Sequence, residues 1–169
     1  MHEQHFDIVG LGSSGNLSFL VLTLVMVVIA VFLWRKPLPA AAKSISVVLV
    51  LGLTLIFSWA WYKAQSAEVS LNMTQFRLDV PFYGETLARS ELIAGGVREI
   101  NLNEEPGLKP DLRTNGMGMP GFQLGWFRLD DGQKALMAVG TGTQVLIPTH
   151  KGYVIIVSTS DAERLIAAL

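Results

Sequence analysis

The sequence predicts an α-helical transmembrane hairpin followed by an all-β domain that a short C-terminal helix closes. Two observations predict the hairpin: uncharged apolar segments at 17–34 and 44–62, and a short basic loop between them. The all-β domain follows from short β-prone runs that alternate with turn residues across 69–159. We therefore divide the 169 residues into a tail (1–16), a two-helix membrane anchor (17–62), a linker (63–68) and one domain (69–169).

Each apolar segment is long enough to cross a hydrocarbon core as a helix, reaching roughly 27 to 28 Å at about 1.5 Å per residue. Both are rich in valine and isoleucine, but in lipid every backbone polar group needs an internal partner, so an isolated segment becomes helical. Aromatic residues cluster at the segment ends, where they favour the headgroup layer: Trp34, Trp59, Trp61 and Tyr62. Because Pro37 and Pro39 disfavour helix before them, the predicted helices cover about 17–36 and 44–62.

Two other interpretations of these segments are weaker. A cleaved signal peptide needs a basic start, and the 16 residues before Leu17 contain no Lys or Arg. A buried helix of a soluble protein would carry a polar stripe at helical period, which neither segment has. We therefore expect both segments to span the membrane.

Charges near the segment ends predict the orientation. The loop carries Arg35, Lys36 and Lys43, whereas the tail has no Lys or Arg and carries Glu3 and Asp7 instead. Loops rich in Lys and Arg stay in the cytoplasm. Lys63 and Arg77, just beyond the second segment, oppose this asymmetry. We expect a multi-pass protein of the bacterial cytoplasmic (inner) membrane whose tail and C-terminal domain are extracytoplasmic, in the periplasm where an outer membrane exists.

About seven antiparallel strands are predicted in the domain, at 69–78, 80–88, 97–102, 122–129, 134–139, 143–147 and 153–158. Turn residues at Asp131-Gly132, Gly140 to Gly142 and Lys151-Gly152 predict an antiparallel meander in the second half. The chain then ends in SDAERLIAAL, where Ser160 and Glu163 fit a capping box that opens a short helix. That helix offers three apolar side chains to the core: Leu165, Ile166 and Leu169.

Specific stretches also resemble a known family. The segment RTNGMGMPGFQLGWFRLDDGQKALMAV, followed by VLIPTHKGYVIIVSTSDAERLIAAL, is similar to the C-terminal part of small bacterial pleckstrin-homology-like (PH-like) domains that are often attached to membrane helices. In those families a Gly-rich entry leads into a strand of the type G-[FY]-x-x-G-x-[FY], here Gly121, Phe122, Gly125 and Phe127. The resemblance covers about residues 69–169 and implies a PH-like barrel whose open end is plugged by the C-terminal helix.

Three glycines in the middle of the domain allow more than one interpretation. Gly116, Gly118 and Gly121 spell G-x-G-x-x-G, but a dinucleotide-binding loop must follow a strand and open a helix, and here a strand and hairpin follow. The first interpretation is structural: the glycines let an irregular connection over 103–120 bend into the barrel. The other is that this connection binds a ligand, with a carboxylate or phosphate held by Arg113.

The candidate contact residues for a ligand or partner come from this region: Arg113, Asn115, Gly116, Gly118, Phe122 and Trp126. Phosphoinositide-type binding is not expected, because the chain after Tyr62 has 10 Lys plus Arg against 12 Asp plus Glu and no basic run. We likewise expect no nucleic-acid partner. Catalysis and metal binding have little support, since the chain has no Cys and only His2, His5 and His150, without a ligand spacing. No catalytic residue, metal or cofactor is assigned.

The sequence thus predicts a non-enzymatic integral membrane protein. Its PH-like domain would mediate protein–protein or assembly interactions next to the bilayer, with a protein partner or a second copy of the chain. The alternative is a lipid-, peptide- or small-ligand-binding module with a pocket around Arg113, Phe122 and Trp126.

Overall fold

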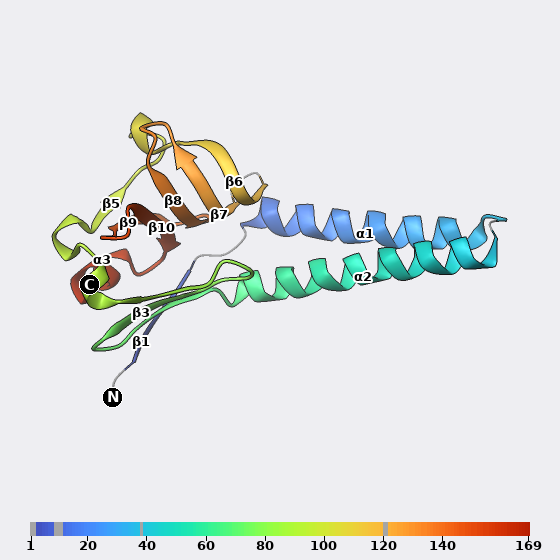
Figure 1. Ribbon diagram of the computed structural model, residues 1–169, viewed down its shortest axis with the longest axis horizontal. Helices are drawn as coiled ribbons and strands as arrows, with labels where there is room; N and C mark the ends of the chain where they lie inside the picture. The colour runs from blue at the N-terminus through green and yellow to red at the C-terminus, as the bar shows by residue number, and fades with distance from the viewer. Residues whose placement is uncertain (1–2, 9–11, 38, 120–121) are drawn as a thin grey trace.

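Two long antiparallel helices extend from a β-rich domain in the computed structural model of the chain (Figure 1). The structure describes residues 3–8, 12–37, 39–119 and 122–169. The predicted class, a membrane-compatible helical hairpin followed by a PH-like β domain and a C-terminal helix, is confirmed.

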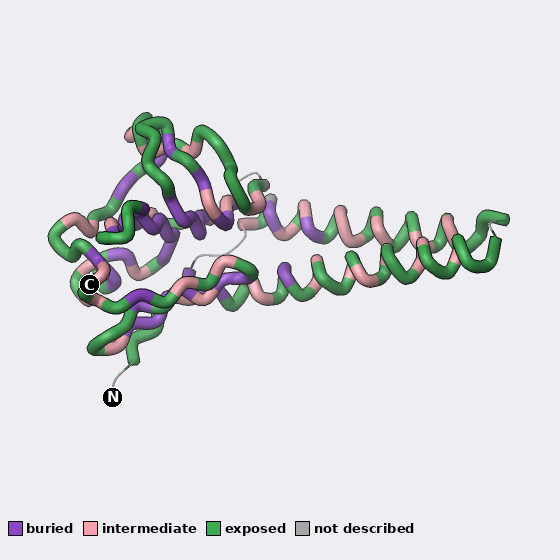
Figure 2. The backbone as a smooth tube through the Cα atoms, viewed as in Figure 1, coloured by how far each residue is buried: buried purple, intermediate pink, exposed green. Residues whose placement is uncertain are grey.

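The two helices are α1 (Ser13–Arg35) and α2 (Ala40–Gln65). Both are long and apolar enough to cross a membrane, and their side chains are exposed along most of their length (Figure 2). Exposed leucine and valine side chains over such a length form a large apolar surface, as is expected of helices that face lipid. Near the domain, Trp61 Nε1 donates a hydrogen bond to Asn16 Oδ1 at 2.9 Å and joins the two helix ends.

Within the described residues, ten strands form two sheets. The strands are β1 (Gln4–Asp7), β2 (Glu68–Leu71), β3 (Gln75–Asp79), β4 (Glu85–Ala88), β5 (Arg98–Ile100), β6 (Pro110–Met119), β7 (Phe122–Leu129), β8 (Lys134–Val139), β9 (Thr143–Pro148) and β10 (Tyr153–Thr159). The smaller elements are the 3₁₀ turns η1 (Arg89–Glu91), η2 (Ala94–Gly96) and η3 (Pro106–Leu108) and the helix α3 (Ala162–Ala168). The four-stranded sheet has the order β1-β2-β3-β4, and the six-stranded sheet has the order β5-β9-β10-β8-β7-β6.

Strand β1 lies in the tail before α1, yet it pairs antiparallel with β2, which follows α2. The pairing runs from Gln4 opposite Leu71 to Asp7 opposite Glu68. Beyond the strand, the Ile8 amide donates to the Ala67 carbonyl oxygen at 3.0 Å, and Thr159 Oγ1 of β10 donates to the Asp7 carbonyl oxygen at 2.9 Å. Both ends of the helical hairpin therefore enter one folded unit, so the tail and the domain lie on the same side of any membrane that the helices cross.

The predicted meander is wrong in the second half of the chain. Strand β10 lies between β8 and β9, pairs antiparallel with β9 and runs parallel to β8. The connection around Gly140 to Gly142 is therefore not a hairpin between neighbours. Because β10 fills the gap that this connection leaves, every residue of β10 is buried.

Some predicted strand limits also differ. The expected strand over 69–78 is a hairpin of β2 and β3, because the Asn72 side chain accepts from the amides of Thr74 and Gln75 and turns the chain. The expected strand at 80–88 is reduced to β4. The connection over 103–120, expected to be irregular, contains the ten-residue strand β6 from Pro110 onward, which pairs with β7.

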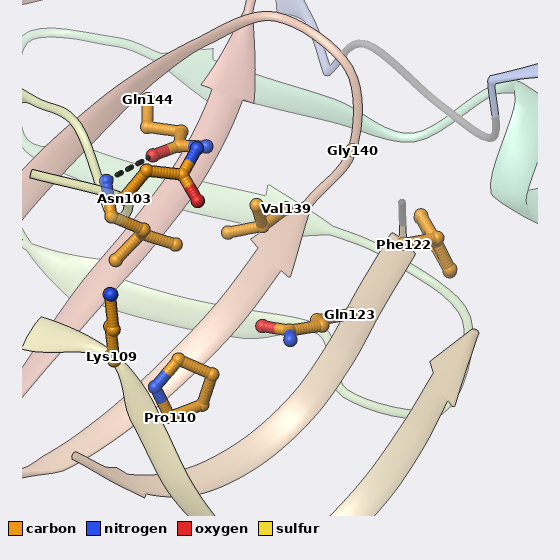
Figure 3. Close-up of a pocket in the computed structure, with 9 residues that line it drawn as sticks. Asn103, Lys109, Pro110, Phe122, Gln123, Val139, Gly140 and Gln144 are labelled. Carbon is orange, nitrogen blue, oxygen red and sulfur yellow. Dashed lines mark hydrogen bonds between the residues drawn. The ribbon is translucent and has the colours of Figure 1, made fainter. Parts of the chain in front are cut away.

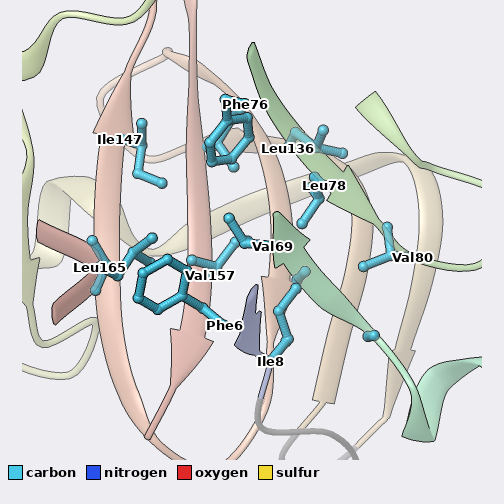
Figure 4. Close-up of a cluster of buried hydrophobic side chains, with 14 of the residues drawn as sticks. Phe6, Ile8, Val69, Phe76, Leu78, Val80, Leu136, Ile147, Val157 and Leu165 are labelled. Carbon is cyan, nitrogen blue, oxygen red and sulfur yellow. The ribbon is translucent and has the colours of Figure 1, made fainter. Parts of the chain in front are cut away.

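The core fills the space between the two sheets (Figure 4), and its members include Phe6, Phe76, Leu136, Ile147 and Leu165. Leu165, from α3, is fully buried, which confirms that the C-terminal helix contributes to the core. The predicted capping box is wrong: Asp161 is the N-cap and makes no side-chain cap, while its amide donates to Thr159 Oγ1 at 3.2 Å.

The far end of α3 is held by an arginine from η1. The guanidinium of Arg89 donates to the carbonyl oxygens of Ala168 and Leu169, and to that of Asn72 in the β2–β3 turn. A positive side chain at a helix C-terminus satisfies carbonyls that have no partner inside the helix. Arg89 thereby joins the helix to the four-stranded sheet.

Candidate functional site

The six candidate residues lie on two neighbouring strands. Arg113, Asn115, Gly116 and Gly118 are on β6, and Phe122 and Trp126 are on β7. Asn115 is opposite Trp126, and Gly118 is opposite Gln123. The structure thus brings the candidates into one β-hairpin but, as their side-chain positions show, not into one pocket.

Gly116 and Gly125 face each other at the closest approach of the two strands. A Cβ atom on Gly116 would lie 2.4 Å from the Leu124 carbonyl oxygen, and Gly125 has a φ of +115°, which side chains rarely adopt. These glycines permit close backbone contact within a sheet. Since strand β7 follows, no helix begins where a dinucleotide would need one. Gly121 lies outside the described residues.

The aromatic candidates belong to the core side of β7. Phe122 is buried, and the Trp126 ring meets the Tyr153 ring edge to face, with centroids 4.9 Å apart. Lys134 Nζ lies 4.1 Å from the centroid of the Trp126 ring. Arg113, in contrast, is exposed on β6 and extends toward Gly118, where its Nη1 atom would be 3.2 Å from an added Cβ. Arg113 and Trp126 therefore do not share a cavity with Phe122.

Strand β6 is the outer strand of the six-stranded sheet, and among the described residues only β7 pairs with it. Residues 111–115 are all exposed, and the Leu112 side chain is 47% exposed. Two irregularities interrupt the pairing with β7, between Pro110 and Leu112 and between Arg113 and Asn115. The strand thus presents backbone N–H and C=O groups along an open edge, which is a template for another strand.

A cavity of about 480 Å³ opens on the same sheet (Figure 3). Its lining residues are Leu102, Asn103, Lys109, Pro110, Phe122, Gln123, Val139, Gly140 and Gln144. Gln144 Oε1 accepts a hydrogen bond from the Leu102 amide at 3.0 Å, which ties the chain after β5 to β9. Gln123 Oε1 is buried, and no hydrogen-bond partner is found for it among the described residues. A buried polar atom without a partner is costly, so this atom marks a place where a donor would bind favourably.

An ion pair lies in the segment between β5 and η3, close in sequence to the cavity residues Asn103 and Lys109. Arg98 Nη1 on β5 donates to Glu105 Oε1 at 2.9 Å, directly before η3. The hydrogen bond from Arg98 is the main cause of the lowered pKa of Glu105, so the carboxylate stays charged at neutral pH. Lys109, which follows η3, is the one cationic side chain among the described residues that line the cavity. Sequence patterns did not single out Gln123, Gln144 or Lys109, because their proximity depends on the order of strands in the sheet.

No group of three or more potential metal ligands occurs among the described residues. His5 Nδ1 lies 3.2 Å from Glu68 Oε2 across the β1–β2 pair, and the His150 backbone amide donates to the Glu91 carbonyl oxygen. His2 lies outside the described residues.

Two packed sheets, a C-terminal helix in the core and two helices long and apolar enough to cross a membrane define the class as a PH-type domain with a candidate membrane anchor. A family model described as a bacterial PH domain matches residues 70–169, more than half of the chain, and the chain belongs to that family. This confirms the resemblance found in the sequence over about 69–169. No curated protein and no solved structure matches the chain.

Proposed function

We propose that this chain is a non-enzymatic integral membrane protein whose PH domain binds another protein next to the bilayer through the open edge of β6. The observation that carries the proposal is the ten-residue outer strand β6, which is exposed over residues 111–115. An extended segment of a partner, or β6 of a second copy, would add a strand there, with main-chain hydrogen bonds giving affinity.

The candidate residues of β6 then receive roles. Arg113 and Leu112 are exposed beside the open edge and would contact side chains of the added strand. Gly116 lets β6 lie close to β7, and Gly118 leaves room for the guanidinium of Arg113. The Asn115 side chain is held in place by the Tyr83 hydroxyl, which donates a hydrogen bond to Asn115 Oδ1 at 3.1 Å. Anionic lipid headgroups of the phosphoinositide type are not proposed as ligands, given the net negative charge of the domain.

The location follows the charge asymmetry of the loop. We propose the bacterial cytoplasmic membrane, with the loop between α1 and α2 in the cytoplasm and the domain outside. The pairing of β1 with β2 supports a shared side for the tail and the domain, since both strands belong to one sheet.

A photo-crosslinking amino acid at Leu112 tests the edge-strand proposal in the native membrane. We expect a discrete crosslinked product, either with a second protein or with another copy of the chain. Met73 is the matched control, because it is 85% exposed in the β2–β3 turn of the other sheet and should yield none. The substitution Leu112→Lys, which places a charge beside the edge, should reduce crosslinking from a probe at Thr114. Equal products from positions 112 and 73, or none from 112, would contradict the proposal.

A second candidate function is supported by the cavity. Gln123 Oε1, the neighbouring amides of Asn103 and Gln144, and Lys109 suit a small polar ligand that donates a hydrogen bond and carries a negative group. Native mass spectrometry of the full chain, released gently from membranes, would show an added mass that Gln123→Leu and Lys109→Met remove. Lys151→Met, outside the cavity, is the control. A chain without added mass in several growth conditions would contradict ligand binding and leave the edge-strand proposal untouched.

A further inference from the structure

The loop between β3 and β4, residues 80–84, lies at the end of the domain where α1 begins and α2 ends (Figure 1). At its tip the Phe82 ring meets the Trp59 ring of α2 edge to face, with centroids 5.2 Å apart. A second link lies beside it, since Lys63 Nζ is 3.7 Å from Asp79 Oδ2. The loop thus touches the membrane helix itself.

This contact fixes the depth of Phe82 relative to the helices. Trp59 lies four residues before Lys63, where the apolar span Ala40–Lys63 ends. At a rise of about 1.5 Å per residue, Trp59 is roughly 6 Å inside that end. A ring in contact with Trp59 is therefore level with the boundary between headgroups and hydrocarbon when α2 spans a bilayer.

Phe82 is also held in an unusual conformation. Its φ is +66°, and it is the one residue other than glycine with positive φ among the described residues. Its side chain is nevertheless 56% exposed. Its neighbour Tyr83 is fixed by a hydrogen bond to Asn115 and packs close to Gly125. A strained backbone that exposes a large apolar ring is unfavourable in water and indicates a constraint related to function.

We propose that Phe82 inserts into the headgroup layer of the bilayer that holds α1 and α2. The contacting rings of Phe82 and Trp59, together with the exposed Tyr62 three residues further along α2, are called here the aromatic anchor. Aromatic rings favour this layer. The anchor fixes the angle of the PH domain on the membrane and thereby sets the direction in which the β6 edge faces. This inference rests on the proposed membrane integration of the helices.

Spin labels attached to single introduced cysteines test the insertion. Each label goes to one chosen position, because the natural chain has no cysteine. The labels go on Phe82→Cys, on Met73→Cys at the opposite end of β3, and on Val48→Cys, which is 68% exposed on α2. The full chain is placed in phosphatidylcholine vesicles, and collisions with oxygen and with a water-soluble nickel chelate are measured. We expect label 48 to report lipid, label 73 to report water, and label 82 to collide with nickel several-fold less often than label 73.

The control label separates two kinds of failure. If label 82 behaves like label 73 while label 48 reports lipid, the insertion of Phe82 is wrong and the membrane integration stands. If label 48 also reports water, the integration and the insertion are both overturned.

The orienting role needs its own measurement. With labels on Val48→Cys and Met73→Cys in one chain, pulsed dipolar spectroscopy gives the distribution of distances between helix and domain. We expect a narrow distribution that Phe82→Gly broadens and Phe82→Trp preserves. Phe82→Gly is compatible with the positive φ, so the fold should tolerate it. An unchanged distribution in Phe82→Gly would show that Phe82 does not orient the domain.

Discussion

At the scale of single residues, Gly116 tests the close contact between β6 and β7. A methyl group there would meet the Leu124 carbonyl oxygen, which belongs to the backbone and cannot move aside cheaply. We expect Gly116→Ala to lower the free energy of unfolding by about 1 to 3 kcal/mol, as overpacking usually does. Gly95→Ala is the matched control, since nothing lies within 4 Å of its Cβ, and it should change stability by less than about 0.5 kcal/mol. Equal effects in chemical denaturation would show that the strands can separate without cost.

Tyr153 provides a residue-scale prediction about pH. Its hydroxyl donates to Glu85 Oε1 at 3.1 Å, and burial, followed by that hydrogen bond, raises the pKa of Tyr153 well above its ordinary value. A folded pKa above the unfolded value of about 10 means that the stabilising effect is complete below pH 10. It is then lost as pH rises from about 10 toward the folded pKa, because the unfolded chain ionises first.

Melting curves of the wild type and Tyr153→Phe measure this effect. At pH 8 we expect the variant to be less stable by about 1 kcal/mol, the net worth of one hydrogen bond. Between pH 10 and 11 the wild type should lose stability faster than the variant, so that the two melting temperatures converge. Parallel curves over this range would show that Tyr153 does not cause the pH dependence.

At the scale of elements, α3 is short but supplies a fully buried side chain. Leu165 is in the core, and Ile166 and Leu169 pack against it. Leu165→Ala should lower the free energy of unfolding by about 2 to 5 kcal/mol, whereas Leu112→Ala, at an exposed position, should lower it far less. Ending the chain after Arg164 also removes the acceptors of Arg89, so we expect that truncated domain not to fold. An unchanged melting temperature after truncation would show that α3 is not part of the core.

Strand β1 leads to a second element-scale prediction. Phe6 is 1% exposed and packs between the sheets, although it precedes both membrane helices in the chain. Phe6→Ala should lower the free energy of unfolding by about 3 to 5 kcal/mol. His5→Ala is the control from the same strand, because His5 is exposed and its bond to Glu68 lies at the surface. If Phe6→Ala lowers the free energy of unfolding as little as His5→Ala does, the tail is not part of the folded domain.

The elements also show what the sequence could predict. Strands β7 and β8 have the predicted bounds, because dense β-prone residues and the Asp131-Gly132 turn define them locally. Strand β6 was missed because Pro110, Gly116 and Gly118 lower strand propensity, and its pairing depends on β7. The order of β8, β10 and β9 was missed because turn residues show where the chain reverses, not which strand fills the space between. Likewise, nothing local in Gln4–Asp7 indicates a partner more than 60 residues away.

The candidate site was predicted only in part, for a similar reason. Arg113 and the glycines stood out as residue types, and they occupy the strand that now carries the proposed interface. The cavity residues Gln123 and Gln144 are ordinary polar residues in β-prone runs. Gln123 stands out because its Oε1 atom is buried and has no hydrogen-bond partner among the described residues. Gln123 and Gln144 lie near each other because of the order of strands in the sheet, which composition and spacing do not predict.

At the scale of the whole molecule, the membrane hairpin is inserted between two paired strands. Because β1 and β2 belong to one sheet, the domain is joined to the helical hairpin at two points and not by a single flexible linker. Helix α2 ends at Gln65 and β2 begins at Glu68, so only two residues connect them. The two connections restrict how the domain can rotate about the hairpin, so the proposed membrane integration would give the β6 edge and the proposed aromatic anchor fixed directions relative to the bilayer.

The most direct test of this account is the accessibility of single cysteines in intact cells whose outer membrane, where present, has been made permeable. A membrane-impermeant maleimide should label Gln4→Cys on β1 and Ser66→Cys after α2, and should not label Ala41→Cys at the start of α2 until the cells are lysed. Replacing Arg35, Lys36 and Lys43 with neutral residues should scramble this pattern. Labelling of Ala41→Cys alone would place the domain in the cytoplasm and overturn the proposed orientation. Labelling of only one of Gln4→Cys and Ser66→Cys would contradict the central claim, since the two strands of one sheet cannot lie on opposite sides of a membrane.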